Sequence, residues 1–152
     1  MKNYIYRAIA LLLISSSVFG QAPNWSVDEN KYQYTMTFVG FLNSDGNGLV
    51  NTDDKVAAFV NGECRGVTSV IYVESEKRYC TYLTVFANEN NETVSFKIYD
   101  SAKDVVKSID KTVSFKINEH YGNPFQAYSF AKPALQSGAQ MLDLSFTDVV
   151  RN

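Results

Sequence analysis

The chain has 152 residues, enough for one ordinary domain and too few for a typical two-domain enzyme. Apolar residues make up 45% and charged residues 20%, a balance that suits a packed core and argues against disordered, collagen-like or low-complexity chains. The formal charge of −2 gives no reason to expect a nucleic acid or an anionic membrane as partner, because phosphates are bound by clustered Lys and Arg.

The N-terminus has the pattern of a secretory signal peptide. Lys2 and Arg7 precede an apolar stretch, residues 8–14, and the small residue Gly20 follows as a cleavage point. The apolar stretch is shorter than the roughly 20 residues of a membrane-spanning helix, and no other run is long enough. No Cys stands directly after the cleavage point at Gly20, so a lipid anchor on a new N-terminal Cys is not expected. We therefore predict a protein that is exported, either secreted or held at the cell surface.

From residue 32 onward the pattern has a period of two. Between Tyr32 and Leu42 one face carries large apolar residues and Gly40, while the other carries Gln33, Thr35 and Thr37, which predicts a half-buried strand. Further stretches rich in Val, Ile, Tyr, Phe and Thr also indicate strands. These stretches are residues 56–60, 66–73, 79–87, 93–98 and 112–117.

Turn-forming residues separate these strands. Asn61-Gly62 predicts a tight hairpin, because both residues tolerate a positive φ, and residues 88–91 and 100–103 are polar breaks. Residues 104–110 are ambiguous between strand and helix. About seven to nine short strands at this spacing predict an all-β protein, an antiparallel β-sandwich of immunoglobulin-like or jelly-roll type.

One hexapeptide, Thr-Val-Ser-Phe-Lys-Ile, occurs at residues 93–98 and again at 112–117. A solenoid would require several copies, so the identity predicts two strands in the same environment.

The C-terminal part differs in composition. Residues 131–140 are small, polar and contain Pro133, which indicates a linker. Leu142, Leu144 and Phe146 then alternate with polar residues, which predicts a last strand that joins the sheet; the alternative is a segment that contacts a partner. The predicted parts are a signal peptide (1–20), a β-sandwich domain (21–130) and a linker with a C-terminal strand (131–152).

The two cysteines, Cys64 and Cys80, would lie in an oxidising compartment after export. If the chain between them forms one hairpin, they sit at different heights along the ladder, and a disulfide needs Cα atoms within roughly 7 Å. A disulfide and two small buried thiols therefore both remain open. Two Cys and one His do not have the close-spaced pairs of a zinc site.

Residues 54–67 read Asp-Lys-Val-Ala-Ala-Phe-Val-Asn-Gly-Glu-Cys-Arg-Gly-Val and are preceded by Asn24-Trp25 and by Tyr-x-Tyr-x-Met at 32–36. With Leu-Thr-Val at 83–85, Phe-Lys-x-Tyr-Asp at 96–100 and Tyr-Gly-Asn-Pro-Phe at 121–125, this order resembles a recurring module of secreted gram-negative bacterial proteins. The resemblance implies a surface or extracellular β-sandwich, often attached to larger adhesive or degradative proteins exported by the type IX route. It implies no reaction. This chain departs from the pattern because it has no catalytic neighbour and no room for a sorting domain.

The sharpest local motif is a twelve-residue pattern of oxygen ligands that matches a calcium loop. It has Gly48 at position six, the backbone carbonyl of Leu49 at position seven, and the remaining ligands at positions one, three, five, nine and twelve: Asn43, Asp45, Asn47, Asn51 and Asp54. Only two of these are charged, which predicts weak binding, sufficient at the roughly millimolar calcium outside cells. The alternative is a solvated hairpin loop with Asp-Gly and Asn-Gly turns.

Asp54 has a competing role. It lies one predicted strand before Arg65 and could accept a bidentate hydrogen bond from that guanidinium instead of binding calcium.

Aromatic side chains are the candidate ligand-binding residues. Tyr72, Tyr82 and Tyr99 lie on the predicted polar-facing side of their strands, and sugar rings stack on the faces of aromatic rings. The alternative is that each ring simply packs on the sheet. Trp25 is interpreted as a lid over one end of the core. His120, the only histidine, has no catalytic motif around it and is expected to cap a loop.

The sequence therefore predicts an exported, non-catalytic binding or interaction module whose partner is a polysaccharide or a cell-surface protein, with calcium as its one candidate cofactor and carbohydrate as candidate ligand. The first alternative is a structural component of an outer-surface assembly, in which the C-terminal segment adds a strand to a partner. The second is a small polysaccharide-degrading enzyme with two carboxylates in a cleft.

Overall fold

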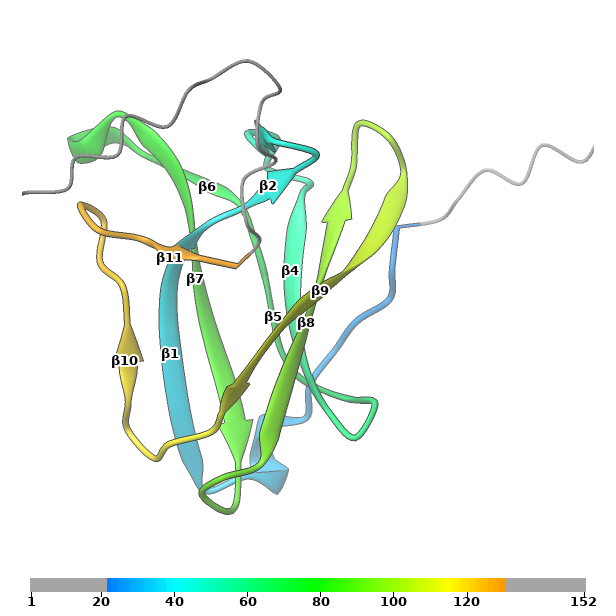
Figure 1. The fold of residues 1–152 in the computed structure, drawn as a ribbon, viewed down its shortest axis with the longest axis vertical. Coiled ribbons are helices and arrows are strands. Elements are labelled where there is room, and N and C mark those ends of the chain that lie inside the picture. The colour runs from blue at the N-terminus through cyan, green and yellow to red at the C-terminus, as the bar shows by residue number, and fades with distance from the viewer. Residues whose placement is uncertain (1–21, 131–152) are drawn as a thin grey trace, which may run out of the picture.

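The computed structural model describes residues 22–130, and within them the protein is an all-β, sandwich-like domain (Figure 1). Two sheets face each other across one core, which confirms the predicted fold class. The predicted signal peptide and C-terminal strand lie outside the described residues. Within residues 22–130 no helix is long and apolar enough to cross a membrane.

The first sheet has the strand order β10-β1-β7-β6, and β11 also pairs with β1. β1 is antiparallel to β7 and parallel to the two short strands β10 and β11. Its strands are β1 (Tyr34–Phe41), β6 (Ile71–Val73), β7 (Arg78–Ala87), β10 (His120–Tyr121) and β11 (Tyr128–Ser129).

The second sheet has the order β5-β4-β8-β9 and is antiparallel throughout. Its strands are β4 (Lys55–Val60), β5 (Glu63–Ser69), β8 (Thr93–Asp100) and β9 (Val105–Ser114). A small separate hairpin and two 3-10 turns complete the described elements: β2 (Asn43–Ser44), β3 (Asn47–Gly48), η1 (Glu29–Lys31) and η2 (Glu74–Glu76).

The core lies between the inner faces of the two sheets. Successive side chains of a strand point to opposite faces, so Met36 and Phe38 of β1 meet alternate residues of the facing sheet. Phe130 follows β11 and is fully buried against Phe38 and Phe96. A Cβ at Gly40 would come within 2.2 Å of the Phe130 ring, so a side chain there would displace this aromatic group. Other large residues that are fully buried include Leu83, Val85, Val94 and Phe115.

The predicted hairpin between β4 and β5 is confirmed. Asn61 has φ 49° and Gly62 has φ 82°, the two left-handed residues of a type I′ turn, whose twist matches the flanking strands.

Two strand predictions need correction. Residues 66–73 do not form one strand, because the chain breaks at the buried Val70, whose N–H donates to the Asp54 carbonyl oxygen (2.9 Å). β5 therefore ends in one sheet and β6 begins in the other. Of the ambiguous residues 104–110, residues 105–110 belong to β9, the edge strand beside β8, and Asp104 (φ 53°) lies in the turn before it.

The two copies of the repeated hexapeptide lie in different environments, so that prediction was wrong. The first copy lies wholly within β8, between β4 and β9. The second leaves β9 after Ser114, and Phe115 exchanges backbone hydrogen bonds with the turn at Asn91 and Glu92 (both 2.8 Å). The copies are antiparallel neighbours, with Val94 opposite Val113, and only the first has strands on both sides.

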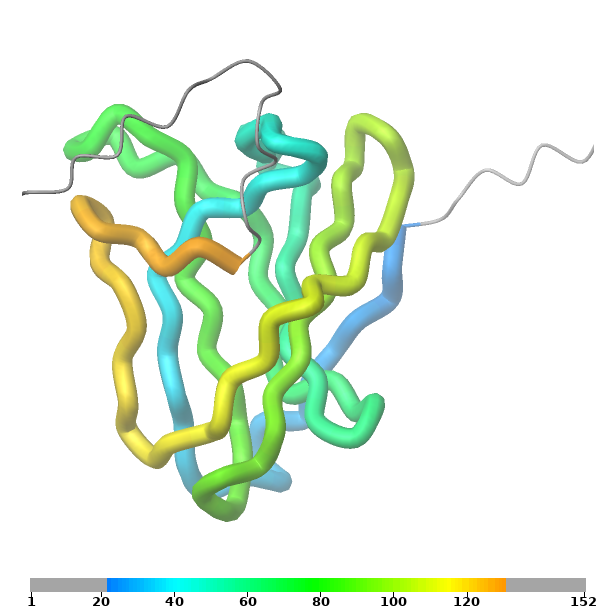
Figure 2. The backbone as a smooth tube through the Cα atoms, viewed as in Figure 1, coloured from blue at the N-terminus to red at the C-terminus, as the bar shows by residue number. Residues whose placement is uncertain are grey.

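The N-terminal segment runs along the outside of the second sheet and contacts it at β4 (Figure 2). The Trp25 ring packs edge-on against Phe59 of β4, with ring centroids 5.8 Å apart, and the Lys97 ammonium lies over the same phenyl ring. Since Phe59 alternates with the inward-facing Ala58 and Val60, Trp25 covers the outside of the sheet and is not a lid on the core.

Candidate ligand-binding groove

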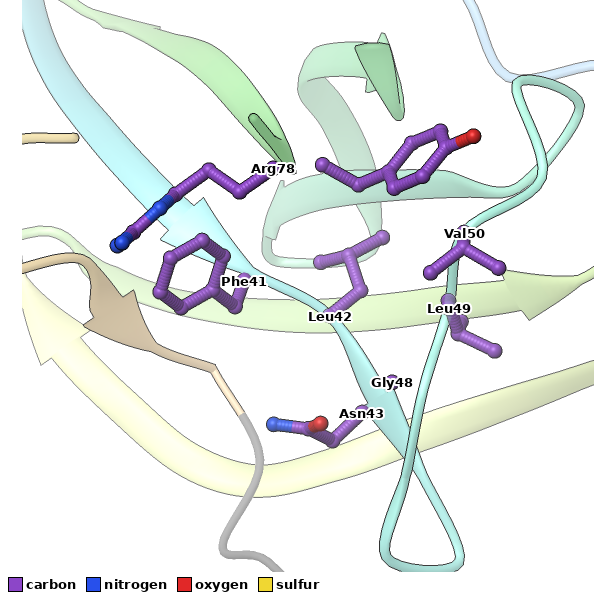
Figure 3. Close-up of a pocket in the computed structure, with 8 residues that line it drawn as sticks. Phe41, Leu42, Asn43, Gly48, Leu49, Val50 and Arg78 are labelled. Atoms are coloured by element: carbon purple, nitrogen blue, oxygen red, sulfur yellow. The ribbon is translucent and has the colours of Figure 1, made fainter. Parts of the chain in front are cut away.

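A groove of about 360 Å³ opens at the end of the sandwich where β1 leaves its sheet (Figure 3). Its lining is mostly apolar, with one guanidinium and one side-chain amide. The lining residues are Phe41, Leu42, Asn43, Gly48, Leu49, Val50, Arg78 and Tyr79.

One wall comes from the β2–β3 hairpin. Asp45 (φ 53°) and Gly46 (φ 82°) form a two-residue turn that brings the chain back, and the Leu49 N–H donates to the Leu42 carbonyl oxygen (2.9 Å). Leu42 is buried, whereas Val50 is 58% exposed. The hairpin therefore places an exposed apolar side chain above a buried apolar floor.

A cluster of charges holds the tip of this hairpin, and we call Asp45, Asp100, Lys103 and Lys107 the lysine cluster. The Asp45 carboxylate pairs with the ammonium groups of Lys103 (3.2 Å) and Lys107 (2.5 Å). Lys103 also pairs with the buried Asp100 (3.3 Å), and its backbone N–H donates to the same carboxylate (3.2 Å). The turn after β8 and the strand β9 thus fix the groove wall.

These contacts shift the pKa of both carboxyl groups. Hydrogen bonds from Lys107 and Lys103 lower the pKa of Asp45. Burial acts to raise the pKa of Asp100, but the Ser44 hydroxyl and Lys103 outweigh it, so this pKa also lies below its ordinary value. In turn, hydrogen bonds to the carboxylates of Asp45 and then Asp100 raise the pKa of Lys103.

The opposite wall comes from the start of β7. The Tyr79 ring packs against Tyr72 of β6 with centroids 4.9 Å apart, and the Arg78 guanidinium lies 5.7 Å from the centroid of the Phe41 ring. Arg78 donates to the carbonyl oxygens of Pro124 (3.0 Å) and Glu76 (3.4 Å). The cation therefore ties the rim of the groove to the loop between β10 and β11.

That loop presents one large apolar side chain to solvent. The Asn123 side-chain oxygen accepts hydrogen bonds from the backbone N–H groups of Phe125 (2.9 Å) and Gln126 (2.8 Å). Phe125 is 73% exposed at the tip of this turn, which adds an aromatic group beside the arginine end of the groove.

The residues of the predicted calcium loop lie in or beside this wall and bond to protein groups. The Asp54 carboxylate accepts hydrogen bonds from the backbone N–H and hydroxyl of Ser101 (2.8 and 2.7 Å) and from the Asn51 N–H (3.0 Å). The Asn51 side-chain oxygen accepts from the Asp53 N–H. Asn43 and Asn47 belong to the hairpin strands, and Leu49 follows them. Within residues 22–130 no group of three or more His, Cys, Asp or Glu is placed to hold a metal. Calcium stays a prediction, and the lysine partners of Asp45 count against it.

The predicted pair of Asp54 with Arg65 was wrong, because the two residues lie at opposite ends of β4 and β5. Arg65 instead centres what we call the arginine cluster: Arg65, Tyr32, Glu63 and Glu92. Its guanidinium pairs with Glu63 (3.4 Å) and Glu92 (3.5 Å) and stacks 4.4 Å from the Tyr32 ring centroid. Tyr32 in turn donates to Glu63 (2.9 Å).

The three candidate tyrosines do not form one platform. Tyr99 belongs to the other sheet and is buried, and its hydroxyl donates to Asp104 (2.8 Å), which raises its pKa. Tyr72 lies opposite Tyr79 in the β6–β7 ladder, so Tyr82, three residues further along, points to the other face. Only Tyr72 lies beside the groove, through its contact with Tyr79.

Cys64 and Cys80 are free thiols. Cys64 is opposite Phe59 in the β4–β5 ladder, whereas Cys80 is opposite Ile71 in the other sheet. His120 lies in β10, with its Nδ1 2.7 Å from the Thr37 hydroxyl.

The sequence did not single out Phe41, Arg78 or Tyr79 as site residues. Each lies at the end of a strand, and no local motif marks them, because they meet only when β1 and β7 pair. The comparisons with protein-family models, curated proteins and solved structures found no match to this chain.

Proposed function

We propose that this protein is an exported, non-catalytic binding module and that the groove is its binding surface. The observation that carries the proposal is the lining: apolar and aromatic side chains with Arg78 and Asn43 as the polar groups. None of the lining residues is Asp, Glu, His or Cys, the usual acids, bases and nucleophiles of hydrolases. An open apolar groove with a few fixed polar groups is typical of ligand recognition.

Two classes of ligand fit this lining. The rings of Phe41 and Tyr79, with donors on Asn43 and Arg78, suit a polysaccharide, whose sugars stack on aromatic faces. The aliphatic floor, Leu42 and Leu49, favours an extended polypeptide of a cell-surface protein, which places alternate side chains in such grooves. The supporting features for export are the signal-peptide pattern and the resemblance to secreted modules.

The test is a ligand screen with a matched pair of variants. Val50 (58% exposed) lines the groove, whereas Val106 (46% exposed) lies on β9 and does not. Because both side chains are exposed, neither Val50→Asp nor Val106→Asp should change the melting temperature appreciably. We expect Val50→Asp to lose binding to glycan or peptide arrays by at least about tenfold and Val106→Asp to keep it.

Equal binding by all three proteins would place the ligand elsewhere and overturn the groove assignment. Binding to neither array would remove the support for a binding module and favour the alternative of a structural component of an outer-surface assembly.

A further inference from the structure

Arg78 is a cation with no acidic partner inside the described domain. Within residues 22–130 its hydrogen bonds go to backbone carbonyl oxygens alone, and it takes part in no ion pair. Arg65, by contrast, pairs with two carboxylates. A guanidinium has five N–H donors, so Arg78 retains donors for a carboxylate that approaches along the groove.

The described chain ends beside this groove. In the parallel pairing of β11 with β1, Ser129 lies opposite Phe41, which lines the groove. Phe130 is then buried in the core, so the following residues begin from a fixed point next to the groove.

The chain beyond this point contains a segment whose chemistry matches the lining. In residues 142–148, outside the described part, Leu142, Leu144 and Phe146 alternate with polar residues, and the first of these is Asp143. In an extended segment, alternate side chains share one face. The apolar face would suit the floor of the groove, and the carboxylate would suit Arg78.

The connection is long enough. Residues 131–141 supply eleven linking residues, which reach about 37 Å when extended and have a root-mean-square span of about 18 Å when flexible. A link of this length gives an effective concentration on the order of millimolar, so even a weak contact within one chain is populated.

We infer that residues 142–148 bind in the groove of the same chain, with Leu142 and Leu144 on its apolar floor and the Asp143 carboxylate paired with Arg78. This inference rests on the proposed function, because it names the groove's resident ligand. Any external ligand then competes with the chain's own segment.

The first test uses the full chain with labelled methyl groups. Leu144→Asp should shift the methyl resonances of Leu42, Leu49 and Val50 and leave those of Val106 unchanged. Leu135→Asp, in the linking residues, is the matched control and should shift none of them. Unchanged groove resonances in Leu144→Asp would overturn the inference.

The second test is competition. A labelled peptide of residues 140–150 should bind full-length Leu144→Asp about tenfold more tightly than the unaltered chain, because the internal competitor is lost. Equal affinities, or binding to neither protein, would overturn the inference. A glycan that binds equally in both proteins and is lost in Val50→Asp would leave the groove's function standing and reject its internal ligand.

The third test concerns the ion pair. Arg78→Gln and Asp143→Asn should each release the segment, and the double variant should release it no further than either single one. Arg78→Lys keeps the charge but lacks the planar guanidinium, so the fraction of segment released should lie between those of the unaltered chain and Arg78→Gln. Additive effects would contradict the pair. Groove resonances that depend on protein concentration, with a dimer in sedimentation, would assign the segment to a second copy and overturn binding within one chain.

Discussion

The arginine cluster and the lysine cluster lie at opposite ends of the second sheet and use similar charges differently. The Arg65 side chain is only 11% exposed and meets two carboxylates and an aromatic ring, so one cation connects β5, the turn before β8 and the N-terminal segment. In the lysine cluster Asp45 is 63% exposed and Lys103 is 48% exposed. Water and salt screen the pair of Asp45 with Lys103, whereas the pair of Arg65 with Glu92 is largely shielded. We conclude that the first cluster stabilises the fold and the second positions the groove wall.

The largest effect is expected from breaking the arginine cluster. Arg65→Ala removes the stacked guanidinium and leaves the partly buried Glu92 without its cation, which should lower the free energy of unfolding by about 3 kcal/mol. Urea denaturation measures the loss. Arg65→Lys keeps the charge and should lose about half as much, and equal losses in the two variants would show that planarity and stacking matter more than charge.

A smaller effect is expected at Asp54, beside the lysine cluster. Asp54→Asn weakens the three hydrogen bonds to Ser101 and Asn51, and should cost about 2 kcal/mol of unfolding free energy. Asp53→Asn, at the exposed neighbouring residue, is the control and should change the unfolding free energy little. The loss should be the same in millimolar calcium and in chelator; a loss confined to calcium would instead support a metal at this loop.

The smallest effect is expected when the lysine cluster is titrated. The pKa values of Asp45 and Asp100 are lowered in the folded protein, so their contribution is complete above the ordinary carboxyl pKa of about 3.9 and is lost as the pH falls through the lowered values. We therefore expect the melting temperature of the unaltered protein to fall more than that of Asp45→Asn below about pH 4. Parallel curves for the two proteins would show that Asp45 contributes nothing there.

The strands were largely predictable because their cause is local. Alternation around Met36 and Phe38, and the two positive-φ residues Asn61 and Gly62, act within a few residues of chain. The break at Val70 was not predictable from such patterns, because the residues on both sides suit strands equally well and the change of sheet depends on long-range pairing, of β5 with β4 and of β6 with β7.

The identical hexapeptides also show that local sequence does not decide the structure alone. Equal sequences have equal local preferences, yet Phe96 lies in a strand with two neighbours and Phe115 lies just past the end of an edge strand. The partners of Arg65 and Arg78 were missed for this reason too, since Glu92 and Pro124 lie far along the chain from them. Site residues that are defined by such long-range meetings carry no sequence motif.

The packing of Trp25 on Phe59 and of Tyr32 on Arg65 has a mechanical consequence. A pulling force on the N-terminus would first peel these ring contacts from the outside of the second sheet, one after another, before it loaded the hydrogen bonds of β1. A protein tethered by that end would yield in small steps while its core and groove stayed intact.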